Sequence, residues 1–244
     1  MNAVITAGGP IGGEFALLAG TDRKALAPVR GRTLIARTIE ALVGCGIERI
    51  AVVGNDAVGA ECGALAPVKM VRDAGSGGAN VLGALDAWPD DAALLYLTCD
   101  LPYIDERALQ WFLERIDPCA LSMPLTAHDA FSRRFPGAPP FGITLAGERV
   151  VNGGVFHLPA GSRARIRALA SMLFDARKAP WKMAAIAGPS VLVRFAFRQL
   201  SVAALEARAQ RVLDVPVAAV RDAPPELAYD IDVLTEYRYA LDHA

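Results

Sequence analysis

The stretch that decides the fold is Asn2-Ala3-Val4-Ile5-Thr6-Ala7-Gly8-Gly9-Pro10-Ile11-Gly12-Gly13. Its first part is rich in apolar and β-branched residues, so we predict a short β-strand at 2–6. The glycines that follow adopt backbone conformations closed to other residues and let amide groups approach a ligand. Such a loop can wrap phosphate groups, and Lys24 can offer them a positive charge. A flexible turn with a surface lysine is the competing interpretation.

Beyond this loop, the first half of the chain alternates short apolar runs with amphipathic stretches. The alternation is typical of βαβ units and predicts an α/β fold with a parallel sheet. The predicted strands are 2–6, 49–53, 68–71, 93–98 and 120–123. The predicted helices are one that Thr33 caps and that ends at Gly44, then 79–87 and 105–116.

The second half of the chain has a less regular pattern. Prolines and aromatic residues break the periodicity at about 124–140, and we predict an irregular insertion there. We then predict a hairpin of 142–145 and 150–158, a helical segment at about 163–212, a strand at 217–220 and a final helix. Because 244 residues with 53% hydrophobic content can bury one large core, we predict a single domain over 1–244.

Composition argues against several classes of partner. Lys and Arg number 25 against 26 Asp and Glu, so the net charge of −1 gives no broad positive field for nucleic acid or anionic lipid. The N-terminus does not resemble a signal peptide, and no apolar run reaches the about 18 residues of a membrane span. We therefore expect a cytoplasmic protein with no nucleic-acid or membrane partner. The 4 cysteines form no CxxC pair, which suits reduced thiols.

Acidic residues form the second candidate feature. An apolar run, Leu94-Leu95-Tyr96-Leu97-Thr98-Cys99, leads into Asp100. Ligands bind outside the carboxyl ends of parallel strands, so we expect Asp100 to lie near the glycine loop, where a carboxylate can hold a hard metal ion beside a triphosphate. A helix cap is the competing role. Asp230 and Asp232 point the same way if their segment is extended, but an ordinary acidic turn before a helix fits them too.

Together, these segments resemble the MobA-like nucleotidyltransferases. The resemblance covers nearly the first half of the chain and its extreme C-terminus. Its five motifs, in chain order, are Ala7-Gly8-Gly9, Lys24-Ala25-Leu26-Ala27-Pro28-Val29 with Gly31, Asp100-Leu101-Pro102, Asn152-Gly153-Gly154-Val155-Phe156 and Asp230-Ile231-Asp232. Five segments in the family's order are more specific than any one of them. The resemblance implies a three-layer, Rossmann-like nucleotidyltransferase fold with a mixed, mostly parallel central sheet.

The resemblance also implies a role for each candidate residue. Lys24 and Asp100 would be catalytic, and Asp100 and Asp232 would bind Mg2+. The nucleotide would contact Ala7, Gly8, Gly9, Gly12, Gly13, Arg23, Lys24 and, with an equally good alternative as a helix N-terminal residue, Asn80. The acceptor would contact Asn152, Gly153 and Gly154. The implied reaction moves a nucleoside monophosphate group from an NTP to a small phosphorylated acceptor and releases pyrophosphate.

One departure from the family pattern concerns the glycine loop. The family places an arginine there to contact the phosphates, whereas this chain continues Gly12-Gly13-Glu14. Glu14 would repel a triphosphate. Either Arg23, beside Lys24, compensates, or the loop is longer and differently folded. A non-catalytic protein that binds a nucleotide or sugar nucleotide is therefore the alternative. The glycine spacing disfavours a third class, an NAD(P)-dependent reductase, because Ala7 replaces the first glycine of G-x-G-x-x-G. The base, the acceptor and the oligomeric state, monomer or homodimer, stay open.

Overall fold

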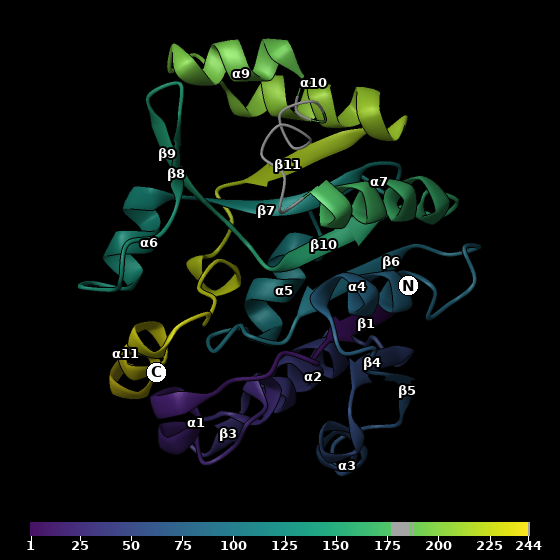
Figure 1. Cartoon of the computed structure of the whole chain (residues 1–244), viewed down its shortest axis with the longest axis vertical. Helices are drawn as coiled ribbons and strands as arrows, with labels where there is room; N and C mark the ends of the chain where they lie inside the picture. The colour runs from purple at the N-terminus through teal and green to yellow at the C-terminus, as the bar shows by residue number, and fades with distance from the viewer. Residues whose placement is uncertain (177–185, 187, 244) are drawn as a thin grey trace.

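The computed structural model describes residues 1–176, 186 and 188–243 (Figure 1). Its centre is a 9-stranded sheet in which β5, β4, β1, β6, β10, β7, β9 and β8 follow one another and β11 pairs with β7. The strands are β1 (Asn2–Thr6), β4 (Ile50–Gly54), β5 (Val68–Arg72), β6 (Leu94–Thr98), β7 (Leu121–Ala127), β8 (Ile143–Leu145), β9 (Glu148–Asn152), β10 (Val155–Leu158) and β11 (Val217–Arg221). Strands β5, β4, β1 and β6 run parallel, and β10 joins them antiparallel. The predicted α/β fold with a mixed, largely parallel sheet is confirmed.

Helices cover both faces of the sheet and make three layers (Figure 1). One face carries α2 (Leu34–Gly44), α3 (Asp56–Gly63) and α5 (Glu106–Leu113), and the other carries α4 (Gly77–Leu85), α7 (Arg163–Ala176) and α10 (Val202–Leu213). Ile5 packs toward the first group and Val4 toward the second, because neighbouring side chains of a strand point to opposite faces. Thr33 caps α2 as predicted: its hydroxyl accepts a hydrogen bond from the Ala36 amide at 3.2 Å.

The remaining elements lie at the edge where the parallel strands end. They are α1 (Gly13–Ala19), the 3-10 turn η1 (Lys24–Leu26), the short hairpin of β2 (Pro28–Val29) and β3 (Arg32–Thr33), α6 (His128–Arg134), η2 (Pro225–Leu227) and α11 (Leu234–His243). Helix α1 was not predicted, because it begins at glycine, a residue that disfavours helix. Phe15 of α1 stacks on Tyr237 of α11 at 4.9 Å, so a contact with the far end of the chain stabilises this helix.

The prediction of an irregular insertion at 124–140 is wrong for its first part. Strand β7 continues to Ala127, and helix α6 follows directly. Pro124 lies inside a strand because its neighbouring strand bulges there: Leu125 faces Asn152 while Ser122 faces His157, which leaves Gly153 and Gly154 as extra residues. The bulge also divides the predicted strand 150–158 into β9 and β10.

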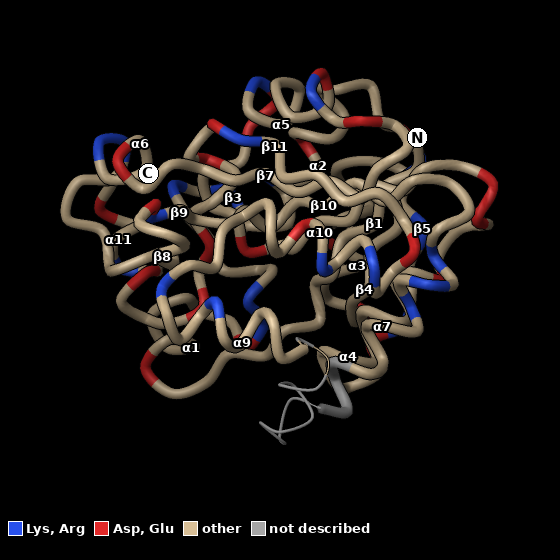
Figure 2. The backbone as a smooth tube through the Cα atoms, turned by 90° about the horizontal axis from the view of Figure 1, so that it is seen from above, with Lys and Arg blue, Asp and Glu red and all other residues tan. Residues whose placement is uncertain are grey.

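The helical segment predicted at 163–212 contains α7, α9 (Pro189–Ala196) and α10 where the structure describes it. Its residues 177–185 and 187 lie outside the described residues. Over the described ranges, no helix has the length and apolar composition needed to cross a membrane. Basic and acidic residues are both scattered over the described trace, in agreement with the near-neutral net charge (Figure 2).

Candidate active site

Strands β1 and β6 end side by side and start the two segments that form the site. Thr6 is paired with Thr98, the last residue of β6. Beyond them, the Cys99 amide donates to the Thr6 carbonyl at 3.3 Å, and the Ala7 amide donates to Val53 at 2.8 Å. The glycine loop and Asp100 therefore leave the sheet next to each other, as expected for the carboxyl ends of parallel strands.

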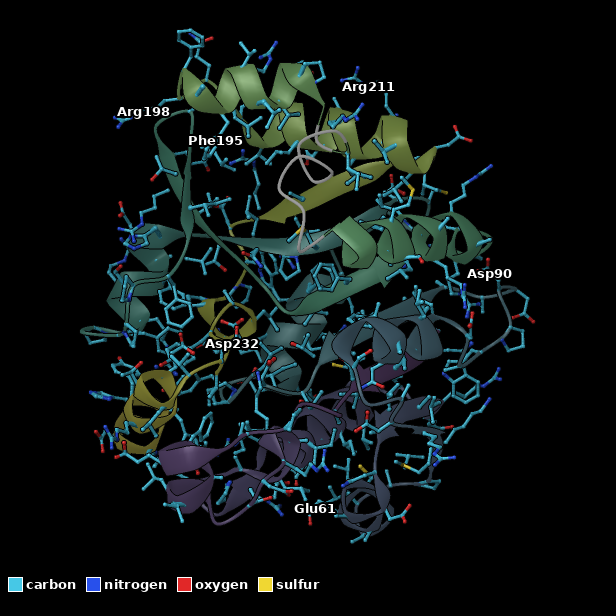
Figure 3. The ribbon with its side chains drawn as sticks, viewed as in Figure 1. Glu61, Asp90, Phe195, Arg198, Arg211 and Asp232 are labelled. Carbon is cyan, nitrogen blue, oxygen red and sulfur yellow. The ribbon has the colours of Figure 1, made fainter. Side chains whose placement is uncertain are left out.

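Lys24 joins the three parts of the site that are far apart in sequence. Its amide donates to the Gly9 carbonyl at 3.0 Å, which ties η1 to the glycine loop. Its Nζ donates to Asp100 Oδ2 at 2.9 Å and to Asp232 Oδ1 at 2.7 Å. The Ile231 amide in turn donates to the Asp100 carbonyl at 3.0 Å, so the C-terminal segment is held against the end of β6. Asp232 lies just before α11 (Figure 3).

The Lys24 ammonium stays charged in this environment. Burial lowers its pKa, but the charges and hydrogen bonds of Asp100 and Asp232 outweigh burial and raise the pKa above its usual value. Asp100 and Asp232 therefore hold a positively charged Lys24 side chain between them. A positive charge at this edge of the sheet can also contact a polyphosphate.

The two carboxylates fit a hard divalent cation. Asp100 Oδ1 is buried and has no hydrogen-bond partner among the described residues, whereas the Asp232 side chain is 68% exposed. The described residues contain no cluster of 3 or more His, Cys, Asp or Glu side chains suited to a metal. This donor set suits Mg2+, which commonly takes only one or two carboxylates and fills its coordination with substrate phosphates and water.

Asp230 adds a third carboxylate on the buried side of the site. Burial, followed by repulsion from Asp100, Asp232 and Glu236, raises the pKa of Asp230 to about 7. The Glu236 carboxylate accepts from the Asp232 amide at 2.6 Å and from the Val233 amide at 2.9 Å, which fixes the turn into α11. The site thus carries excess negative charge that a cation would relieve.

A polar network lies against the glycine loop on its other side. Asn80 Nδ2 donates to Asp73 Oδ1 at 2.9 Å, and Asn80 Oδ1 accepts from the Ala74 amide at 2.7 Å. The hydrogen bonds from Asn80 and the Gly75 amide hold the pKa of Asp73 below its usual value. A Cβ atom on Gly8 would collide with Asn80 Nδ2, so the loop needs glycine at this position to pass the network.

Arg23 and Glu14 occupy different surroundings from those that the resemblance implied. Arg23 Nη1 lies 3.7 Å from Asp73 Oδ2, so its charge is directed at the polar network. Glu14, in α1, pairs with Arg238 of α11. This partner offsets the negative charge that we expected to repel a triphosphate. Gly12 precedes α1 and Gly13 is its first residue, and both have open space where a Cβ would stand.

The order of these segments agrees with a known family. The model of the MobA-like NTP transferase domain matches residues 3–214. This chain belongs to the MobA-like NTP transferase family. Among curated proteins, none matches the sequence.

Solved structures support the family assignment at the level of the fold. A structure titled as a hypothetical transferase from Thermus thermophilus has 29% identity and a TM-score of 0.82, and the match covers 95% of this chain and 96% of that one. A nucleotidyl transferase from Methanothermobacter has 18% identity and a TM-score of 0.55, with 99% and 96% covered. A 4-diphosphocytidyl-2C-methyl-D-erythritol synthase from Anaerococcus prevotii has 13% identity and a TM-score of 0.58, with 99% and 94% covered. At such low identity, the last two show the shared fold alone.

The acceptor-side residues of this MobA-like chain do not all lie in one place. Gly154 packs against Thr98 and Leu101, next to Asp100, with no room for a Cβ. The amides of Gly153 and Gly154 both donate to carbonyls of the protein, at 3.1 Å each. Their backbone is thus already engaged. The exposed Asn152 instead lines an apolar pocket between the sheet and α10.

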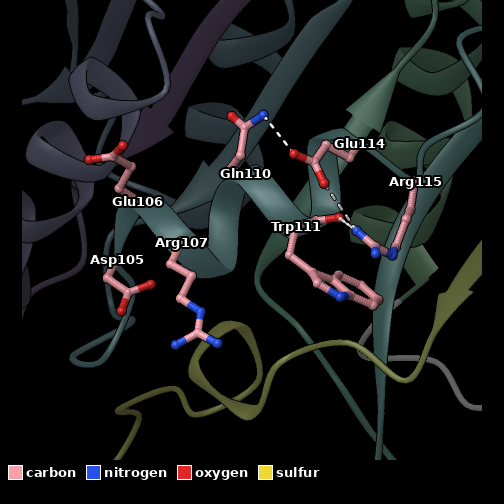
Figure 4. Close-up of a pocket in the computed structure, with 7 residues that line it drawn as sticks. All are labelled: Asp105, Glu106, Arg107, Gln110, Trp111, Glu114 and Arg115. Atoms are coloured by element: carbon pink, nitrogen blue, oxygen red, sulfur yellow. Dashed lines mark hydrogen bonds and ion pairs between the residues drawn. The ribbon is translucent and has the colours of Figure 1, made fainter.

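A separate surface cleft lies on α5, outside the site (Figure 4). Several of its side chains already contact one another: Gln110 donates to Glu114 at 3.2 Å, and the Arg115 guanidinium lies 4.3 Å from the centre of the Trp111 ring. All of its lining residues come from α5 and its two ends. We therefore do not assign the nucleotide to this cleft.

Sequence reasoning missed Asp73 and Arg238. Asp73 follows β5 as Asp100 closely follows β6, so the rule that identified Asp100 could also have identified Asp73. Arg238 gave no such signal, because its partner Glu14 is 224 residues away. Among the predicted residues, the structure brings together Gly9, Lys24, Asp100 and Asp232, and separately Gly8, Arg23 and Asn80.

Proposed function

We propose that this chain transfers a nucleoside monophosphate group from an NTP to a small phosphorylated acceptor with the help of Mg2+. A phosphate oxygen of the acceptor attacks the α-phosphorus of the NTP. The bond from that phosphorus to the oxygen bridging to the β-phosphorus breaks, and pyrophosphate leaves with the electron pair. The single observation that supports this proposal most is the convergence of Lys24, Asp100 and Asp232.

We assign the nucleotide to the edge formed by the glycine loop and η1. The amides around Gly8, Gly9, Gly12 and Gly13 would face the phosphates, and Lys24 would offer them its charge. The network of Arg23, Asp73 and Asn80 borders Gly8, so the base and ribose would lie on that side. Ala7 is fully buried and would hold the start of the loop in place.

Asp100 and Asp232 would hold the Mg2+ ion. When bound, the ion neutralises triphosphate charge and helps to orient the reacting phosphate. Lys24 would then turn from the two carboxylates toward the phosphates, because both are within reach of its flexible side chain. Positioning and charge neutralisation, with no covalent intermediate, would supply most of the rate enhancement.

The acceptor would lie on the side of β9 and β10. Gly154 packs beside Thr98 and Leu101, so the absence of a side chain lets this segment approach the end of β6 next to Asp100. Asn152 provides the exposed polar group of the same segment. Among the α6 residues, Arg134 is already paired with Glu226 at 2.7 Å.

Pyrophosphate release tests the proposal. Wild-type protein is incubated with Mg2+, each of the four NTPs and a panel of small phosphorylated acceptors. We expect release with one NTP, a loss of about 100-fold or more in Asp100→Asn, and wild-type release in Asp222→Asn, whose carboxylate is exposed in the turn after β11. Unchanged release in Asp100→Asn would remove this residue from the mechanism.

A non-catalytic role in binding a nucleotide or sugar nucleotide is the second candidate. The observation that favours it is the position of Arg23, which lies 3.7 Å from Asp73 and was expected to replace the missing loop arginine. Saturable NTP binding without pyrophosphate release, across all NTPs and acceptors, would support this role.

A further inference from the structure

Helix α9 is apolar and yet has no buried residue. Its exposed side chains are large: Leu192 is 43% exposed, Val193 56%, Phe195 66% and, at the C-terminal end of the helix, Phe197 71%. A helix of a globular domain normally turns its apolar side toward the core. Only Val191 does so here, by packing partly on the cluster beneath α10. We call Leu192, Val193, Phe195 and Phe197, with Arg194 and Arg198, the α9 surface.

The apolar character continues onto a neighbouring element. A cleft of 840 Å3 separates Phe195 and Leu200 from the β8–β9 turn at Ala146 and Gly147. Ile143, at the start of β8, is exposed as well. Large exposed apolar patches on soluble domains mark binding surfaces. The patch is therefore a candidate surface for an apolar or amphiphilic partner.

The charges on this part of the molecule are basic. Arg194 is the only charged residue of α9, and Arg198 follows the helix. Neither has an acidic partner among the described residues. Figure 3 shows Phe195, Arg198 and Arg211 at one end of the molecule, away from Glu61. Arg211, which is exposed on α10, adds a third positive charge to this end.

Acidic residues on the elements around α9 are already engaged. Glu206 Oε1 accepts from the Ala219 amide at 2.7 Å. Glu148 pairs with Arg221 at 2.6 Å, and Asp214 pairs with Arg165 at 3.3 Å. The local charge near α9 is thus positive even though the whole chain has a net charge of −1.

We propose that the α9 surface docks on an anionic phospholipid bilayer. Exposed Phe, Leu and Val side chains beside arginines are typical of helices that lie in the membrane interface, with their apolar side at the acyl boundary and their basic residues near headgroup phosphates. This docking is peripheral and needs no spanning helix. It reverses the expectation that the near-neutral composition excludes lipid. Exposed charges more than about 10 Å apart are largely screened in salt, so the local charge of the α9 surface acts on the headgroups and the net charge of the chain does not.

A second copy of the chain is the other occupant that such a patch can take. Two α9 surfaces facing each other would bring Arg194 and Arg198 of both copies together, while the acidic residues described around α9 are already engaged. Like charges at an interface oppose association. Charge complementarity therefore favours the anionic bilayer.

Vesicle flotation of the full chain tests the proposal. The vesicles contain either phosphatidylcholine alone or phosphatidylcholine with phosphatidylglycerol. The variants are Phe195→Ser with Phe197→Ser, and Arg194→Gln with Arg198→Gln. The matched control is Val43→Ser on α2, where the valine is 49% exposed. Melting temperatures show whether each variant folds, and no nucleotide is needed, so the outcome does not depend on the proposed catalysis.

We expect the wild type and Val43→Ser to float with phosphatidylglycerol vesicles and to bind phosphatidylcholine about tenfold or more weakly. Each α9 variant should bind the anionic vesicles about tenfold or more weakly than wild type. If the Phe variant fails to fold, the Arg variant decides. Equal binding by folded α9 variants and wild type, or no wild-type binding, would overturn the proposal. The proposal would also be overturned if the wild type self-associated without binding vesicles and the α9 variants abolished that self-association.

Discussion

At the scale of single residues, Lys24 is the cation that bridges the carboxylates of Asp100 and Asp232. Its Nζ lies 2.9 Å from Asp100 Oδ2 and 2.7 Å from Asp232 Oδ1. In Lys24→Met, both carboxylates lose this partner, and a divalent cation becomes their best substitute. We predict that Mg2+ alone raises the melting temperature of Lys24→Met more than that of wild type, while NTP binding falls about tenfold or more. An equal response of the two proteins to Mg2+ would argue against a shared cation site.

Gly8 offers a second test at this scale. A Cβ there would collide with Asn80 Nδ2 and lie 3.0 Å from Asp73 Cγ, whereas a Cβ on Gly9 would find Lys24 Cε at an ordinary 3.7 Å. We predict that Gly8→Ala loses about 1–3 kcal/mol of unfolding free energy. Gly9→Ala is the matched control and should change it little. Denaturant unfolding measures both values. Equal losses would show that the Asn80 and Asp73 side chains move aside for the extra methyl group without further cost.

At the scale of elements, the bulge at Gly153 and Gly154 connects the site to the second half of the sheet. A Cβ on Gly153 would lie 2.5 Å from both the Leu227 carbonyl oxygen and Pro124 Cγ. The Leu227 backbone would have to shift to make room for the methyl group. We therefore predict that Gly153→Ala loses about 2 kcal/mol or more of unfolding free energy, as measured by denaturant unfolding. Gly63→Ala, at the end of α3 with open space around it, serves as the control. An unchanged unfolding free energy in Gly153→Ala would mean that η2 shifts freely.

The elements that could be predicted were those with local signals. Thr33 and the helical spacing of the apolar residues after it predicted α2, and the apolar run 93–98 predicted β6 to within one residue. Helix α1 could not be predicted, because it begins at glycine and depends on the distant Tyr237. Pro124 argued against a strand at its position, because proline is tolerated inside β7 only where the neighbouring strand bulges at Gly153 and Gly154.

The same division holds for the site. The position of Asp100 after an apolar strand predicted its place beside the glycine loop, and the resemblance added Lys24 and Asp232. The Asp73 network was missed although the same rule applies to it. The direction of Arg23 and the pairing of Glu14 with Arg238 depend on side-chain packing that one sequence does not encode locally.

At the scale of the whole molecule, a buried histidine links stability to pH. His157 is 1% exposed, and its Nδ1 donates to the Ala120 carbonyl at 2.9 Å, since a carbonyl can only accept. Burial lowers the pKa of His157 in the folded protein below the about 6.5 of an unfolded chain. As pH falls below about 6.5, the histidine binds a proton in the unfolded state but not yet in the folded state, and the folded protein loses stability.

The His157→Gln variant isolates this effect. It lacks the titrating ring, so the difference in unfolding free energy between wild type and variant should shrink as pH falls from about 7 to about 5. Denaturant unfolding at several pH values measures the difference. A constant difference over this range would show that His157 does not contribute to the pH dependence.

The central claim is that the glycine loop, Lys24, Asp100 and Asp232 form one site for an NTP and Mg2+. Thermal stabilisation by ATP, GTP, CTP and UTP, each with and without Mg2+, tests it most directly, because a ligand that binds only the folded state raises the melting temperature. We predict a rise with one NTP that requires Mg2+ and disappears in Asp100→Asn. No rise with any NTP, or an equal rise in Asp100→Asn, would contradict the claim.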